Sequence, residues 1–251
     1  MIKFFRKIRQ NLLMENKTGK YFKYAIGEIV LVVIGILLAL SINNWNEHRK
    51  SRLQEVNILT KLNTDLKANL IEIKGLKDMT EKRIKASQTI LNYFEEHKAI
   101  DDSLKHSFEF INNDDLFNNA NTTYKYIENQ GVNILRNDSI LSKITSMYER
   151  HFKNIENREN KNWKILTDDL RPLMDVHLEV SEPQDKDFNE EYALNKPIDM
   201  EALSENMQFK NVIVRNMNFM LLRLRWQKDT LEELEDLINE VELEIQHLNN
   251  Q

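Results

Sequence analysis

Residues 25–42 read AIGEIVLVVIGILLALSI, eighteen positions whose only charge is Glu28. At about 1.5 Å per residue, a helix of this length covers about 27 Å, which is enough to cross the hydrocarbon core of a bilayer. No later stretch of the sequence is as long and as apolar. The sequence therefore predicts a single membrane-spanning helix, which we place at residues 25–46 because Trp45 lies where an interfacial anchor is expected.

The basic residues before the span predict its orientation. Residues 1–24 carry seven Lys and Arg against one acid, Glu15, whereas the bases after the span are diluted by acids. Because positive charge accumulates on the cytoplasmic side, we expect the N-terminus in the cytoplasm and the bulk of the chain outside it. Residues 1–24 would form a cytoplasmic interfacial segment, and residues 47–251 an extracytoplasmic domain. A cleaved signal peptide is the alternative, because Ala39-Leu40-Ser41 resembles a cleavage site.

Net charge restricts the partners. The whole chain carries −5, of which residues 1–24 contribute +7 − 1 = +6, so the remaining residues carry −5 − 6 = −11. An acidic domain of this kind argues against nucleic acid as a partner. The basic segment is expected to contact anionic lipid headgroups, so the lipid bilayer is the first partner that the sequence predicts.

Composition predicts an all-α fold. The chain has five Gly, three Pro and no Cys, so it contains few helix breakers and forms no disulfide. About 200 residues beyond the span are enough to bury a hydrophobic core without a metal or a disulfide. We expect one N-terminal transmembrane helix followed by an elongated antiparallel periplasmic helical bundle.

Two segments show the heptad spacing of long packed helices or coiled coils. The first follows the span, and the second lies near the C-terminus, where Gln227 interrupts the pattern. In the first segment the predicted core positions are Val56, Leu59, Leu66, Leu70, Ile73, Ile84, Leu91 and Phe94, with polar residues at Asn63, Lys77, Thr80 and Ser87. In the second they are Ile213, Met217, Met220, Leu224, Leu231, Leu234, Ile238, Val241, Ile245 and Leu248.

Charge predicts how these two helices pair. Residues 229–251 hold eight acids and no Lys or Arg, whereas residues 49–85 hold ten bases and five acids. Antiparallel packing would place the acidic helix against the basic one. The alternative is that the acids form only a solvated face.

Capping residues and breakers divide the chain between these segments. A short helix begins after Asp101, a further helix is expected from Asp115 to Gln130 with Gly131 as its stop, and a long helix begins at Asn137-Asp138-Ser139. Residues 181–200, with Pro183, Pro197 and six acids, look like an exposed loop. Ser204 and Glu205 are the expected start of the C-terminal helix.

The search for chemistry mostly returns negatives. The sequence has no Gly-rich phosphate loop, no HExxH, and no Ser and His in a recognisable triad context, so we expect no catalytic residues, metal or cofactor, and no enzyme. The six His are scattered, and we expect them at the surface. Core packing is the expected role of several aromatic residues, with an aromatic-lined ligand pocket as the alternative: Tyr124, Tyr126, Tyr148, Phe152 and Trp163.

The span contains one candidate contact face. At 100° per residue, Glu28, Gly35, Ala39 and Asn46 lie within about 20° of one another around a helix. Small residues on one face let helices approach closely in lipid, so we expect a homo-oligomer or another membrane protein as partner. Glu28 either carries an ion or proton within a bundle of spans, or reaches interfacial water or a nearby Lys.

The run KYFKYAIGEIVLVVIGILLALSINNWNE, preceded by MIKFFRKIRQNLL, resembles an uncharacterised family of flavobacterial single-span membrane proteins, domain of unknown function 6090. A second, weaker likeness runs from Thr123 through Gly131 to Tyr148. Many relatives have Gln where this chain has Ser41. The resemblance implies an inner-membrane location and a helical exterior, and it implies no known activity. We therefore expect a membrane-anchored scaffold, adaptor or sensor-like binding protein. The alternative is an accessory subunit of an envelope transport or ion-driven machine that uses Glu28.

Overall fold

The computed structural model describes residues 18–113, 115–131, 134–180 and 195–250. The first 17 residues, and with them most of the predicted interfacial segment, lie outside the described residues. The chain forms two compact units, Met1–Val56 and Asn57–Gln251. The second unit begins at Asn57.

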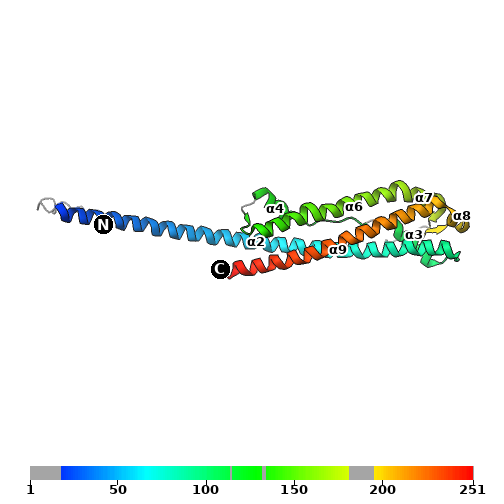
Figure 1. Cartoon of the computed structure of the whole chain (residues 1–251), viewed down its shortest axis with the longest axis horizontal. Helices are drawn as coiled ribbons and strands as arrows, with labels where there is room; N and C mark the ends of the chain where they lie inside the picture. Colours follow the sequence, from blue (N-terminus) through cyan, green and yellow to red (C-terminus); the bar gives the residue numbers. More distant parts are fainter. Residues whose placement is uncertain (1–17, 114, 132–133, 181–194, 251) are drawn as a thin grey trace, which may run out of the picture. The chain divides into compact units, whose positions relative to one another are not determined.

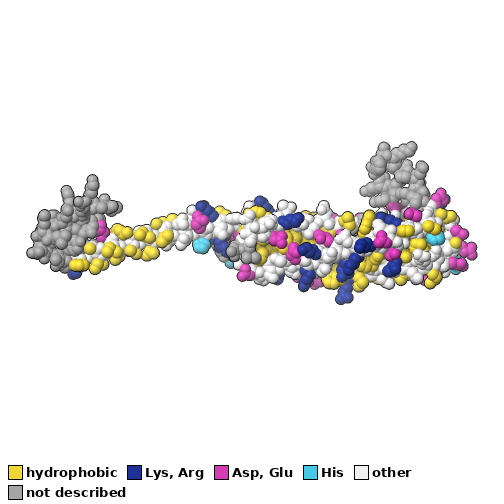
Figure 2. Space-filling view, turned by 90° about the horizontal axis from the view of Figure 1, so that it is seen from above, with side chains coloured by type: hydrophobic (Ala, Val, Ile, Leu, Met, Phe, Trp, Pro, Cys, Tyr) yellow, Lys and Arg dark blue, Asp and Glu magenta, His cyan; other side chains and the backbone are white. Residues whose placement is uncertain are grey.

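One helix, α2 (Thr18–Glu96), contributes to both units. In the first unit its apolar side chains are exposed and form the continuous hydrophobic band of Figure 2. Among the described residues, one helix is long and apolar enough to cross a membrane, and it is α2. The predicted single N-terminal span is confirmed in that sense, although it does not end as a separate helix at Asn46.

The second unit is almost entirely helical (Figure 1). After α2 come α3 (Asp102–Asn112) and α4 (Thr122–Gln130), then a nearly continuous helical run and a two-stranded sheet. The run comprises α5 (Asp138–Ser146), η2 (Met147–Phe152), α6 (Lys153–Lys164), η3 (Ile165–Leu170) and α7 (Arg171–His177). Strands β1 (Leu178–Val180) and β2 (Asn195–Pro197) pair antiparallel, with Leu178 opposite Pro197, before α8 (Met200–Glu205) and α9 (Met207–Asn249).

Two of the predicted helix starts are confirmed by their caps. The Asp101 carboxylate accepts a hydrogen bond from Leu104 N–H at 3.0 Å, and the Asn137 side-chain oxygen accepts one from Ile140 N–H at 3.2 Å. The predicted start at Ser204 is wrong, because α8 continues through Glu205. The actual N-cap of α9 is Asn206, whose side-chain oxygen accepts from Phe209 N–H at 3.0 Å.

Two other boundaries differ from the prediction. The helix expected from Asp115 begins only at Thr122, and residues 115–121 before it have no regular secondary structure. Gly131 ends α4 as predicted, with φ at 88°, a conformation that glycine adopts without strain. Part of the expected loop at 181–200 forms β2 and the start of α8, and residues 181–194 lie outside the described residues.

The buried face of α2 in the second unit repeats every three or four residues without interruption. Its members are Leu59, Leu62, Leu66, Asn69, Ile73, Leu76, Thr80, Arg83, Ser87, Ile90 and Phe94, each at most 4 % exposed. The predicted frame is therefore half wrong. Leu70, Ile84 and Leu91 are only half-buried. In each case the preceding residue, Asn69, Arg83 or Ile90, is the buried one.

The buried face of α9 shows the same difference. Met217, Leu224 and Ile245 are half-buried, while the positions next to the first two, Asn216 and Arg223, are buried. Met220, Leu234, Val241 and Leu248 are buried as predicted. Each of the two long helices therefore buries polar residues at core positions. A heptad frame chosen by hydrophobicity alone does not identify these residues.

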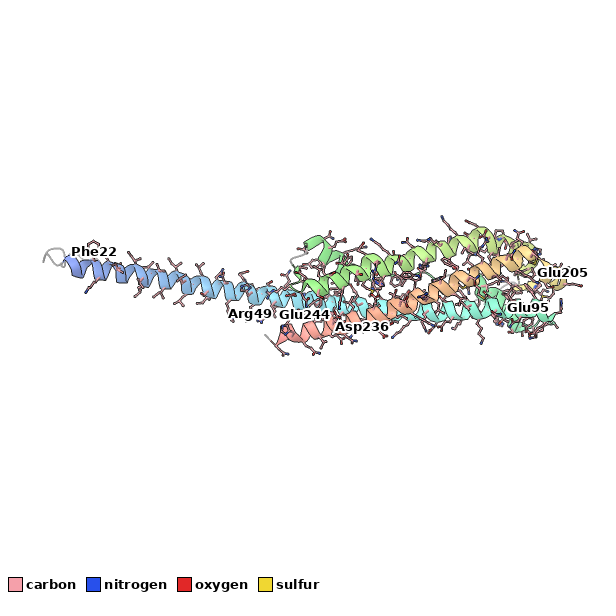
Figure 3. The ribbon with its side chains drawn as sticks, in the orientation of Figure 1. Phe22, Arg49, Glu95, Glu205, Asp236 and Glu244 are labelled. Atoms are coloured by element: carbon pink, nitrogen blue, oxygen red, sulfur yellow. The ribbon has the colours of Figure 1, made fainter. Side chains whose placement is uncertain are left out.

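Ion pairs set the antiparallel register of α2 and α9. Lys67 Nζ lies 2.6 Å from a Glu242 carboxylate oxygen, Lys74 Nζ 2.7 Å from Glu235, and Lys228 Nζ 3.4 Å from Glu81. The three pairs are seven residues apart on each helix, and their order along α9 is the reverse of their order along α2. Figure 3 shows Asp236 and Glu244 on α9 beside α2, with Glu95 and Glu205 at the same end of the bundle. The predicted antiparallel pairing is confirmed.

The run from α5 to α7 packs antiparallel to α9 on another side. Lys143 pairs with Glu240, His151 Nε2 lies 3.1 Å from Glu233 Oε2, and the Arg215 guanidinium lies 2.8 Å from Asp169. Arg158 adds a cation–π contact, 4.7 Å from the centroid of the Trp226 ring. His151 lies eight residues after Lys143, whereas their partners on α9, Glu240 and Glu233, are seven residues apart. The π-helical turn η2, which begins at Met147, accounts for the extra residue. The acids of α9 are thus divided between two neighbouring helices.

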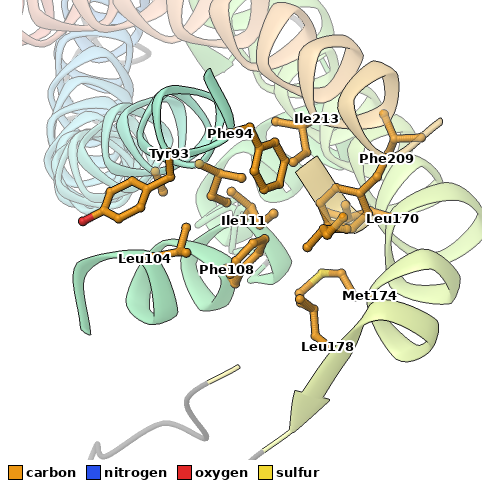
Figure 4. Packing of buried hydrophobic residues seen from close by; sticks show 14 of the residues in the cluster. Tyr93, Phe94, Leu104, Phe108, Ile111, Leu170, Met174, Leu178, Phe209 and Ile213 are labelled. Atoms are coloured by element: carbon orange, nitrogen blue, oxygen red, sulfur yellow. The ribbon is translucent and has the colours of Figure 1, made fainter. Parts of the chain in front are cut away.

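The end of the bundle that contains the C-terminus of α2 is closed by an apolar cluster (Figure 4). Phe209 at the start of α9 packs edge-on against Phe94 of α2 and Phe108 of α3, with ring centroids 6.3 and 6.2 Å apart. Leu170, Met174 and Leu178 complete the cluster from η3, α7 and β1, respectively. Burying a large apolar side chain contributes about 1.5–3 kcal/mol, so this cluster fixes the end of the bundle.

We predict that the register depends measurably on the Lys74–Glu235 pair. Lys74→Glu should lower the free energy of unfolding by about 0.2–1 kcal/mol, because both side chains are about half exposed. Adding Glu235→Lys should restore most of the loss in denaturant unfolding of the full chain in detergent. Lys61→Glu, which makes the same charge change away from this pair, is the control. Failure of the double variant to recover would contradict the register.

Candidate functional site

A cluster of polar side chains occupies the core where Glu81 and Lys228 meet. We call it the polar layer, and each member is at most 2 % exposed. Its members are Thr80, Arg83 and Ser87 of α2; Glu159 and Asn162 of α6; and Asn216, Arg223, Gln227 and Thr230 of α9. Buried charge is expensive unless it is paired and hydrogen-bonded, so the arrangement of these groups requires an explanation.

Two ion pairs balance the charge of the polar layer. Arg223 Nη2 donates to Glu159 Oε1 at 3.0 Å, and both side chains are almost completely buried. Arg83 Nη2 donates to Asp115 Oδ2 at 2.6 Å. With two guanidinium groups and two carboxylates, the set is neutral overall. The polar layer itself holds two guanidinium groups and one carboxylate, so it is neutral only together with Asp115, whose side chain is 38 % exposed.

The remaining contacts of this set go to the main chain between α3 and α4. Arg223 Nη2 also donates to the Asp115 carbonyl oxygen at 3.3 Å, and Glu159 Oε2 accepts from Phe117 N–H at 2.7 Å. Residues 115–121 have no regular secondary structure, and we call this segment the strap. The buried side chains of Arg83, Arg223 and Glu159 thus hold a length of polypeptide in place.

Side chains of α2 and α6 hydrogen-bond to further groups of the strap. The Asn69 amide pairs with Ala120 twice, accepting from its N–H at 2.7 Å and donating to its carbonyl at 2.9 Å. Glu72 accepts from Asn118 N–H at 3.5 Å, and Glu156 accepts from the Asn119 side chain at 3.4 Å. Backbone outside helices and sheets needs other hydrogen-bond partners, and these polar side chains supply some of them.

Several buried polar atoms of the layer have no hydrogen-bond partner among the described residues. They are both side-chain polar atoms of Gln227, the Asn216 oxygen and the Ser87 hydroxyl. A buried polar group left without a partner costs about 1–3 kcal/mol. The contact between α2 and α9 is therefore weaker in the polar layer than in the apolar parts on either side.

An aromatic cluster lies next to the strap. Tyr124 and Tyr148 stack with ring centroids 4.4 Å apart and planes 1° from parallel, and Phe152 packs edge-on against Tyr148 at 5.0 Å and Phe117 at 5.2 Å. The Tyr148 hydroxyl donates to the Ala120 carbonyl at 3.1 Å. The expected core packing is confirmed for Tyr124, Tyr148 and Phe152. It is wrong for Trp163 and Tyr126, which are nearly half exposed.

The tyrosine hydroxyls keep their protons. Burial, with the nearby Glu149 and Glu128, raises the pKa of Tyr124 to about 12, and burial raises the pKa of Tyr148 as well. A surface groove of about 280 Å³ is lined by Tyr124 and Tyr148 themselves and by polar residues of both signs of charge: Asn119, Asn121, Lys125, Glu128, Glu149, Lys153 and Glu156. The groove thus contains two of the aromatic residues for which the sequence left a ligand pocket as the alternative, and a ligand there stays a prediction.

His151 does not lie at the surface as predicted. It is 5 % exposed and sits in η2, with Nε2 facing Glu233 and the Arg150 guanidinium at 2.8 Å. Burial lowers the pKa of His151, Glu233 opposes that shift, and Arg150 adds to it. Among the described residues, no group of three or more His, Asp or Glu is arranged to hold a metal ion.

The predicted contact face of the span lies on α2. Gly35 and Ala39 are exposed and Glu28 and Asn46 half-exposed, and among the described residues no atom lies within 4 Å of where a Gly35 Cβ would be. The face is therefore open in the protomer. That this face contacts a second copy or another membrane protein stays a prediction.

The sequence reasoning missed the main members of the polar layer, Arg83, Glu159 and Arg223, and their partner Asp115. Only one sequence signal pointed to them. Asn69 and Arg83 lie at intervals of seven residues from Leu62, Leu76 and Ile90, all of which are buried. A heptad frame through these positions would have placed both polar residues in the core.

The fold and these sites describe an all-α protein with one helix able to cross a membrane and a bundle that encloses a polar layer. The family of unknown function DUF6090 matches residues 28–220, most of the chain, and the protein belongs to this family. No curated protein and no solved structure matches the chain.

We predict that the Arg223–Glu159 pair is coupled. Arg223→Met should destabilise the fold by about 3–5 kcal/mol, because it leaves Glu159 as a buried carboxylate without its cation. Glu159→Gln in the same background removes that charge and keeps an oxygen for Phe117 N–H, so it should recover part of the loss. Denaturant unfolding of the four proteins measures the coupling, and simple additivity would contradict it.

We also predict a pH effect from His151. Because its pKa is lower in the folded state, the unfolded chain takes up a proton first as the pH falls, and stability is lost. The advantage of the wild type over His151→Gln in melting temperature should therefore shrink from about pH 7.5 to about pH 5.5. An advantage that grows over this range would mean that Glu233 governs the site instead.

Proposed function

We propose that this protein is a membrane-anchored helical-bundle binding protein, a scaffold, adaptor or sensor-like module without enzymatic activity. We propose further that it resides in the bacterial inner membrane, with its N-terminus in the cytoplasm and the bundle in the periplasm. The seven bases of residues 1–24 support this orientation.

The observation that carries the proposal is that α2 supplies both the apolar helix of the first unit and a structural helix of the second. A chain built in this way fixes a rigid bundle to a membrane. The buried charges of the bundle hold its own strap, as Arg223 and Glu159 do, so they serve the fold rather than a reaction. A stable, anchored surface is what a binding protein needs.

Cysteine labelling tests the topology, since the chain has no native Cys. Glu205→Cys lies on an exposed residue of the bundle, and Lys7→Cys lies in the basic segment. In intact spheroplasts, a maleimide that cannot cross membranes should label Glu205→Cys and should label Lys7→Cys only after lysis. The opposite pattern would overturn the orientation, and release of the protein in a carbonate wash would overturn the anchoring.

The second candidate function, an accessory subunit of an envelope transport or ion-driven machine, is favoured by Glu28. It is the one charged residue of the stretch 25–42, and ionisable groups within a span commonly serve ion or proton pathways. Glu28→Gln removes the charge and keeps the shape. A Glu28→Gln strain with normal protein levels and the defect of a deletion strain would support this function, and full complementation would reject it.

A further inference from the structure

One side of α2 in the second unit is not covered by the bundle. It carries Ala68, Ile71, Gly75, Asp78 and Lys82, all exposed and spaced by three and four residues, opposite the buried face through Ile73 and Leu76. We call this side the open face. Its spacing is that of a helix-pairing seam.

Ile71 is the most conspicuous member of the open face. It is 73 % exposed, more than any other large hydrophobic side chain among the described residues, including those of the apolar span. Isolated apolar residues are common on surfaces. Here the residue one turn further along is a glycine, which changes the interpretation.

Gly75 lies in the interior of a long helix, where glycine is the least favourable residue except proline. Among the described residues, no atom lies within 4 Å of where its Cβ would be, so nothing inside the protomer requires a small residue there. A glycine beside an exposed Ile instead fits the close approach of a helix from outside.

The charges near the open face fit a second copy of this chain. Lys67 and Lys74, which border the face, are neutralised by Glu242 and Glu235 of α9. Asp78 and Lys82 lie one turn apart on the face, and Asp78 pairs with its neighbour Lys77 at 2.7 Å. Side-by-side parallel copies would place Asp78 of one chain within a turn of the second copy's Lys82.

Anchoring in one membrane restricts how two copies can meet. Two chains anchored in this way must meet side by side and parallel, which brings like residues of the open face to the same level.

We propose that the open face is a docking surface for a second copy of this chain, with α2 of each copy parallel and in contact through Ala68, Ile71 and Gly75. The inference rests on the membrane anchoring of the proposed function. A seam of a few turns is smaller than the interface of a stable soluble dimer. Confinement to one membrane raises the effective concentration of the two copies and lets this seam hold them together.

Disulfide cross-linking of the full chain in native membranes tests the proposal. Ile71→Cys and Ala68→Cys should each form a dimer under mild oxidation, seen as a band of twice the mass on a non-reducing gel. Gln88→Cys, exposed on another side of the same helix, is the matched control and should remain at least fivefold less cross-linked. Equal cross-linking at Gln88, or a monomer at both test positions, would overturn the proposal.

A second variant separates pairing from folding. In the Ala68→Cys background, Gly75→Leu should reduce the dimer band severalfold while leaving the melting temperature of the protein unchanged or higher, because the added side chain meets open space within the protomer. A lower melting temperature with normal cross-linking would show that Gly75 serves the fold instead.

The outcomes also separate this inference from the proposed function. The chain can be anchored with the expected topology and still be monomeric, or cross-link through Ile71→Cys to a different polypeptide. Either result overturns the second copy as partner but is compatible with the proposed binding function. A chain released from the membrane by a carbonate wash removes the basis of both.

Discussion

The Arg223–Glu159 pair is the interaction on which the centre of the bundle depends. Removing two charges from water is costly, and the cost is offset only when both groups are fully hydrogen-bonded. Here the second oxygen of Glu159 binds Phe117 N–H, and the same guanidinium nitrogen reaches the Asp115 carbonyl. Three segments distant in sequence, α6, α9 and the strap, must therefore be in place together before either charge is satisfied.

This requirement gives the fold its specificity. An apolar heptad seam tolerates sliding by a whole heptad, because one leucine packs much like another. A polar layer with Arg83, Glu159 and Arg223 fits only when α2, α6 and α9 are level, and the ion pairs of Lys67 and Lys74 with α9 enforce the same register from outside. The polar layer trades some stability for a single alignment of long, otherwise similar helices.

The sequence alone predicted the helical class, the single apolar span, the antiparallel pairing and the caps at Asp101 and Asn137, because these depend on local pattern and on charge. It did not predict the polar layer. Arg83 and Arg223 look like surface residues until a carboxylate from a different part of the chain is known to face them. The strap was predicted as helix for a related reason: its conformation is held by Asn69 and Glu159, which lie 51 and 42 positions along the chain from the strap residues that they bind.

The π turn η2 has a consequence for how this protein can change over time. It adds one residue to the run from Lys143 to His151 relative to the facing stretch of α9, and contacts on both sides of it stay matched. Deleting one residue here would restore ordinary helix geometry but turn everything on one side of the deletion by about 100°. Insertions and deletions in this helix are therefore tolerated only where a π turn can absorb them, so its length is under tighter constraint than most of its individual side chains.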